Sequence, residues 1–315
     1  MLESDLCEIH SSLRVTIDVN NILMAVEKYF GGTANYRKGK GAEYIFWMMR
    51  YHPTAYLYPV SRACGGARQD LGVEGSVAVI MNVPYYLEFL IWRMRCGHGN
   101  GILERNLYML LRSVEMIAFL RVLSIMHISI CMPLRWLAGH CGELSEYNFG
   151  VADMASVIDI MDAAFLQVLD DGEKMLDETF MMGIFDSLKE QIPPFRDYLT
   201  YIFEEKQGSL IGPHQLEDRI LPWDQLRAEL FYPTRVDIIE THDFCTELAC
   251  EAASIFRREF RDERKATHKY LSEIHGERSM AEITDQERKD GLGMAAGNCI
   301  SESGHAAATG DLKTF

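Results

Sequence analysis

The most apolar part of the chain is residues 116–139, MIAFLRVLSIMHISICMPLRWLAG. A helix that spans a membrane needs about 20 consecutive apolar residues to cross roughly 30 Å of hydrocarbon. Here Arg121, His127, Pro133 and Arg135 interrupt the apolar run, and one arginine near a bilayer centre costs about 2.5–3.5 kcal/mol. We therefore expect the buried central helix of a globular core, and no membrane among the partners of the chain.

A buried position for this segment requires a partner for Arg121, because an unpaired buried charge costs several kcal/mol. Carboxylates or backbone acceptors can supply it: Glu104 and Glu115 lie on the same expected helix, and Glu88 precedes that helix. Two interpretations remain open: a structural ion pair, or a pocket that binds an anion. We favour the ion pair, because buried ion pairs occur without any role in a site.

The composition is that of an ordinary globular protein. The chain has 315 residues, of which 48% are hydrophobic and 24% are charged, values typical of soluble domains. Its eight cysteines have irregular spacing and no Cys-x-x-Cys pair, which is typical of reduced thiols rather than of a disulfide framework. The first residues show no signal-peptide pattern. We expect an intracellular protein, located in the cytoplasm or nucleus.

Charge is distributed unevenly between the two halves of the chain. Residues 1–141 have 14 Lys and Arg against 11 Asp and Glu, whereas residues 142–315 have 17 against 35. Within residues 28–69, seven cations accompany one acid, Glu43. Such a division of charge favours contact with a polyanion or self-association.

Hydrophobic periodicity predicts a mainly α protein, a multi-helix bundle around a single core. We expect a Gly/Pro-rich irregular N-terminal region over residues 1–101 and a helical core over 102–275, with a connector at 208–235. Residues 276–315 have few large apolar side chains and no periodicity. Such a segment cannot bury enough surface to offset its ordering entropy, so we expect a disordered C-terminal tail.

Glycine, proline and capping residues suggest where individual helices begin and end. Pro53 limits a short helix over 43–51, and Pro84 and Gly97 suit the first turn and the C-cap of another. Thr234 and Asp237 have capping-box spacing. A short strand is expected at 14–19, and the remaining helices are expected over 102–133, 151–172, 174–191, 194–208 and from 234 to about 270.

The basic region, residues 28–69, is the strongest local indication of function. Its cations alternate with nine aromatic residues. Cations neutralise phosphates and aromatic faces stack bases, at about 1–3 kcal/mol per base, which predicts contact with nucleic acid. The alternative is that the aromatic rings are core and the cations are merely solvated. The candidate nucleic-acid-binding residues are Tyr36, Arg37, Lys38, Lys40, Trp47, Arg50, Arg62 and Arg68.

No sequence motif identifies a reaction, so the leading hypothesis is a non-enzymatic helical binding protein. A helical scaffold that binds other proteins or itself is the alternative, and a metal-dependent hydrolase is less favoured. Only Cys96/His98 and His242/Cys245 approach zinc-ligand spacing. We expect these cysteines to be core thiols and therefore expect no metal and no cofactor.

Overall fold

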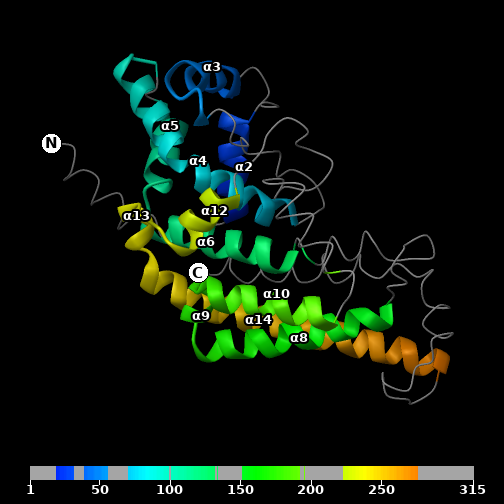
Figure 1. Cartoon of the computed structure of the whole chain (residues 1–315). Coiled ribbons are helices and arrows are strands. Elements are labelled where there is room, and N and C mark those ends of the chain that lie inside the picture. The colour runs from blue at the N-terminus through cyan, green and yellow to red at the C-terminus, as the bar shows by residue number, and fades with distance from the viewer. Residues whose placement is uncertain are drawn as a thin grey trace, which may run out of the picture.

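The computed structural model (Figure 1) shows a fold made of helices. Across the described residues there are α-helices and one short π-helix, and no strand, so the predicted mainly α fold is confirmed. The side chains at 19–22, 70–74, 151–155, 191, 223–225 and 259–275 are not described. The backbone is described for residues 19–31, 39–55, 70–98, 101–131, 133, 151–191, 195 and 223–275.

The labels in Figure 1 follow the chain. They are α2 (Val19–Phe30), α3 (Gly41–Tyr51), α4 (Asp70–Arg95), α5 (Ile102–Leu110), α6 (Val114–Met126), η2 (His127–Cys131), α8 (Val151–Asp170), α9 (Glu173–Leu176), α10 (Glu178–Gln191), α12 (Trp223–Phe231), α13 (Val236–Ile239) and α14 (His242–His275).

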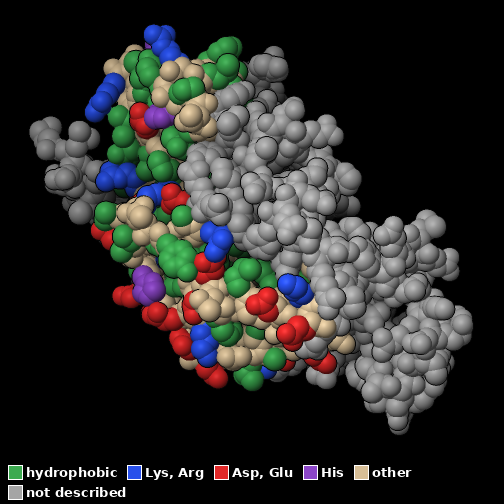
Figure 2. Space-filling model, in the orientation of Figure 1, with side chains coloured by type: hydrophobic (Ala, Val, Ile, Leu, Met, Phe, Trp, Pro, Cys, Tyr) green, Lys and Arg blue, Asp and Glu red, His purple; other side chains and the backbone are tan. Residues whose placement is uncertain are grey.

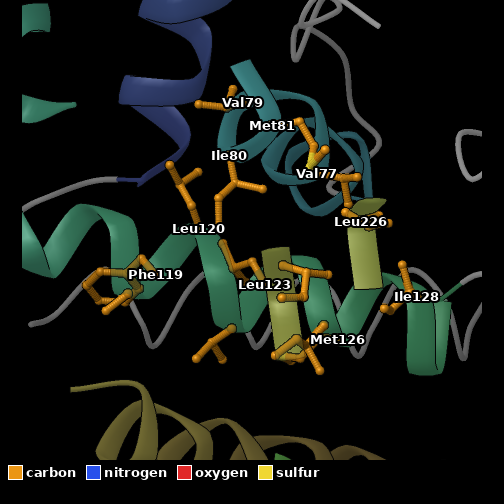
Figure 3. Packing of buried hydrophobic residues seen from close by; sticks show 14 of the residues in the cluster. Val77, Val79, Ile80, Met81, Phe119, Leu120, Leu123, Met126, Ile128 and Leu226 are labelled. Carbon is orange, nitrogen blue, oxygen red and sulfur yellow. The ribbon is translucent and has the colours of Figure 1, made fainter. Parts of the chain in front are cut away.

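The apolar segment identified in the sequence forms the centre of the fold. From Met116 to Cys131, every side chain of α6 and η2 is buried. Helix α4 packs against one side of α6 and α14 against another, and α14 also packs along α8. Figure 3 shows Ile80 of α4 next to Leu120 of α6, and Val77 of α4 next to Leu226 of α12. The expected buried central helix is therefore present.

Two described helical segments are long and apolar enough to cross a membrane by length and composition alone. They are Gly75–Arg95, whose most apolar window is 67% buried in the fold, and Val114–Cys131, whose window is 89% buried. The core helix of a globular protein meets the same criterion, and both segments pack against other helices here.

The expected single helix over 102–133 is wrong, because the helix is interrupted at Leu111–Ser113, between α5 and α6. The Ser113 hydroxyl oxygen accepts a hydrogen bond from the Met116 backbone N–H at 3.1 Å and caps α6. Such a cap satisfies one of the free amides at a helix start. Asp177 divides the expected helix 174–191 in the same way, since its carboxylate accepts from the Thr179 N–H at 2.9 Å.

Pro84 was expected in a first helical turn, but α4 begins at Asp70 and includes the proline. A proline cannot donate the backbone hydrogen bond to the carbonyl four residues earlier, here that of Ile80. Arg235 compensates from a distant part of the chain: its Nη1 donates to the Ile80 carbonyl at 3.1 Å. The guanidinium also bonds to Asp237 at 2.5 Å. Asp237 therefore orients the Arg235 side chain. The predicted capping box, with Thr234 at the N-cap, is wrong, because Arg235 occupies the N-cap of α13.

Arg235→Met is expected to destabilise the protein by about 1–3 kcal/mol, the usual cost of leaving a buried acceptor unsatisfied. Pro84→Ala restores a backbone donor to the Ile80 carbonyl, so it should recover part of this loss in the double variant. Urea unfolding of both single variants and the double variant measures the coupling. Purely additive effects would contradict the compensation by Arg235.

Several predicted boundaries are confirmed. Helix α3 ends at Tyr51, two residues before Pro53, and Gly97 adopts a left-handed φ of 76° just after α4. Helix α8 ends at Asp170, before Gly172. Within the region expected to be irregular, α2, α3 and α4 are helical. The expected connector 208–235 is wrong in its described part, because Trp223–Phe231 form helix α12. Of the expected strand 14–19, Val19 is the first residue of α2. Residues 14–18, 194 and 196–208 of the expected strand and helix, 208–222 of the connector and the tail 276–315 lie outside the described residues.

Candidate nucleic-acid interface

The structure describes three of the eight candidate nucleic-acid-binding residues. Arg50 is exposed on α3, Lys40 is half-buried immediately before this helix, and Trp47 is buried. The other five candidates lie outside the described residues: Tyr36, Arg37, Lys38, Arg62 and Arg68.

The two ends of the glycine-rich segment 31–41 are held together. The Lys40 N–H donates to the Tyr29 carbonyl at 2.6 Å. Gly41 lies so close to Gly31 that a Cβ atom on Gly41 would lie 2.1 Å from the Gly31 carbonyl oxygen. Only glycine permits this approach. The contact places the exposed Lys28 and the half-buried Lys40 at the junction of α2 and α3, where the first amides of α3 add partial positive charge.

Trp47 lies inside an aromatic cluster. It is 4% exposed, and its ring stacks on Tyr44 and meets Phe89 edge-on, with centroids 6.3 and 5.6 Å away. Phe30 packs on Tyr44 and stacks on Tyr86 in the same cluster. These rings therefore stabilise the fold, as the alternative interpretation of the basic region expects, and Trp47 offers no free face for stacking.

The exposed aromatic side chains of α3 are neighbours of Trp47 along the helix. Phe46 is 73% exposed and Tyr51 is half-exposed. The Arg50 guanidinium lies 5.5 Å from the centroid of the Tyr51 ring. The candidate residues included Trp47 but not Phe46. Both lie in one apolar run of the sequence, and only the packing of α3 in the fold distinguishes the buried ring from the exposed one.

We define the basic end as the described surface of α2, α3, α4, α5 and the turns after α4 and α5. Its exposed charged side chains are five cations and one acid, Glu88. Figure 2 shows Lys and Arg side chains over this part of the molecule. The exposed cations are Lys28, Arg50, Arg95, Arg105 and Arg112.

Glu43, the single acid of residues 28–69, is neutralised within the fold. It forms an ion pair with the buried Arg93, whose Nη2 donates to the His98 carbonyl at 2.9 Å. Nearby, the Tyr29 hydroxyl donates to Glu104 at 3.1 Å, and burial raises the pKa of this phenol well above its ordinary value. These contacts join α2, α3, α4 and α5 and leave the exposed cations largely unopposed.

Arg121 has a different partner from the expected carboxylate. It is 2% exposed, and its Nε donates to the Leu230 carbonyl at 2.8 Å, in the last turn of α12. Cys245 lies beside the guanidinium, and burial lowers the pKa of Arg121 and raises that of Cys245. No described carboxylate lies within ion-pair distance of Arg121, so the expected ion pair is wrong. A backbone acceptor at a helix C-terminus takes its place.

Among the described residues, no three His, Cys, Asp or Glu side chains converge as metal ligands. His242 bonds instead to Glu173, with Nε2 and Oε1 2.9 Å apart. The expectation of a core thiol is confirmed for Cys245, which is buried, and is wrong for Cys96, which is exposed.

The basic end thus combines exposed cations, exposed apolar side chains and a buried aromatic support. Its chemistry suits a negatively charged partner. Comparison of the chain with protein-family models, with curated proteins and with solved structures finds no match.

Proposed function

We propose that the protein is a non-catalytic, intracellular binding protein that contacts nucleic acid through its basic end. The observation that supports this most directly is the excess of exposed cations over exposed acids on α2–α5. Lys and Arg neutralise backbone phosphates and release counterions, which supplies most sequence-independent affinity. The free thiols of Cys96, Cys245 and Cys250 support the intracellular location.

The burial of Trp47 changes the predicted mode of contact. Phosphate contacts by Lys28, Lys40, Arg50 and Arg105 provide the affinity in this proposal. Phe46, one turn of α3 from Arg50, is the described aromatic side chain with the most accessible ring. Its ring can stack on an unpaired base next to a phosphate that Arg50 holds.

The test is the salt dependence of binding to a fluorescent 20-base-pair DNA duplex and to one of its strands. These four phosphate contacts predict that the affinity for the duplex falls about 10²-fold between 50 and 200 mM salt. Arg50→Gln combined with Arg105→Gln should weaken binding and reduce the salt slope by about 1 per lost contact.

Lys189→Gln is the matched control, because Lys189 is an exposed cation on α10, outside the basic end. It should leave both the affinity and the slope close to those of the unaltered protein. Absence of binding at 50 mM salt, or affinity that does not change across the salt range, would contradict the proposal.

A further inference from the structure

The helices outside the basic end have the opposite surface charge. Over the described side chains of 156–190 and 226–258, ten acids are exposed against two cations, Lys189 and Arg258. Figure 2 shows Asp and Glu side chains along the lower edge of the molecule, over α8, α9 and α14. The exposed acids are Asp159, Asp170, Asp171, Glu173, Asp177, Asp186, Glu190, Glu240, Asp243 and Glu247.

Large apolar side chains are exposed among these acids, at α13 and the first turn of α14. Val236 is 67% exposed, and Ile239 and Phe244 are each about half-exposed. Glu240 lies four residues before Phe244 in the sequence, and Glu247 lies three residues after it. We name these five residues the acidic–apolar surface. Exposed apolar groups surrounded by polar side chains are typical of protein contact sites.

The helices that carry the acidic–apolar surface, α13 and α14, pack firmly against the core. Ile238, Cys245 and Ala249 are buried, so the outward positions of α13 and α14 are determined by core packing. The bond between His242 and Glu173 joins the start of α14 to α9. The exposed side chains therefore project from a fixed helical frame, which lowers the ordering cost of binding.

We infer that this acidic–apolar surface binds the basic end of a second copy of the chain. The basic end has the complementary features: Phe46 and Met49 are exposed beside Arg50, and Ile102 is exposed beside Arg105. Apolar side chains on both surfaces exclude water at the centre of a contact, and opposite charges around them set the orientation.

Charge determines the geometry of this association. Two acidic–apolar surfaces, or two basic ends, repel each other, so a symmetric contact of like surfaces is disfavoured. When the acidic–apolar surface of one copy binds the basic end of another, the dimer still has a free basic end on one copy and a free acidic–apolar surface on the other. Such a head-to-tail contact continues into longer chains or closes into a ring.

The experiment is light scattering coupled to gel filtration on nuclease-treated protein, at 50 and 500 mM salt. We expect a mean mass above that of the monomer at 50 mM salt, which rises with protein concentration and falls at 500 mM. Two variants each remove one surface: Arg50→Glu/Arg105→Glu alters the basic end, and Glu240→Lys/Glu247→Lys alters the acidic–apolar surface. Each variant alone should be monomeric.

Mixing the two variants is the decisive measurement. Each retains the surface that the other lacks, and the two altered surfaces are again opposite in charge, so an equimolar mixture should associate although each variant alone is monomeric. Asp186→Lys/Glu190→Lys, on α10, makes the same change in charge away from the apolar residues and should associate at least as strongly as the unaltered protein. A monomeric unaltered protein at 50 mM salt, or a mixture that stays monomeric, would overturn the inference. Because no nucleic acid is present, failure here leaves the proposed nucleic-acid contact untouched.

Discussion

Gly172→Ala is expected to lower the melting temperature of the protein by roughly 2–12 °C, from a loss of about 1–3 kcal/mol. Gly172 follows α8 at the point where this helix meets α14. A Cβ atom at this position would lie 2.1 Å from the Thr246 carbonyl oxygen and 2.9 Å from the Cys250 sulfur. Because the first contact is with backbone, α8 and α14 must separate to accommodate the methyl group. Thermal unfolding followed by circular dichroism measures the effect.

Gly183→Ala is the matched control for this prediction. Gly183 lies within α10, and a Cβ atom there meets nothing within 4 Å. Alanine in a helix interior is more favourable than glycine by about 0.5–1 kcal/mol, so this variant should melt slightly higher. Equal effects of the two substitutions would show that the approach of α8 to α14 at Gly172 is not needed for stability.

Features that depend on neighbouring residues could be predicted from the sequence. The end of α3 before Pro53, the left-handed Gly97 and the end of α8 before Gly172 follow from the backbone chemistry of proline and glycine. The burial of residues 116–131 follows from an apolar run that two arginines make unsuitable for lipid.

Features that depend on distant residues could not be predicted. Pro84 within α4 requires a replacement donor, and Arg235 supplies it from 151 positions later in the chain. The partner of Arg121 is a carbonyl at the end of α12, which no spacing pattern indicates. The break at Ser113 was missed for another reason: the apolar periodicity continues on both sides of it, and a single serine is a weak local signal.

The candidate interface was predictable only as a region. Net charge identified residues 28–69, and the described cations extend the same excess to Arg95, Arg105 and Arg112, which lie outside that window. Those three are adjacent to the region only after α4 and α5 fold back on α2. Which aromatic side chains are accessible depends on the packing of α3, and this distinction leads to the final prediction.

Trp47→Ala is expected to destabilise the protein by about 3–5 kcal/mol, because truncation of a buried tryptophan removes its transfer free energy and leaves a cavity. The loss includes the ring contacts of Trp47 with Tyr44 and Phe89, which add about 0.5–1.5 kcal/mol per aromatic pair to area burial. The melting temperature should fall by roughly 6–20 °C.

Phe46→Ala, one position earlier, separates the structural role of the aromatic residues from the binding role. Phe46 is 73% exposed, so its truncation should change stability by no more than about 0.5 kcal/mol. If Phe46 stacks on a base, the same change weakens single-strand binding by about 1–3 kcal/mol. Chemical denaturation and fluorescence anisotropy of both variants give the two quantities. The opposite pattern, in which Trp47→Ala is stable but binds weakly, would show that Trp47 is the stacking residue and that its burial does not persist in the complex.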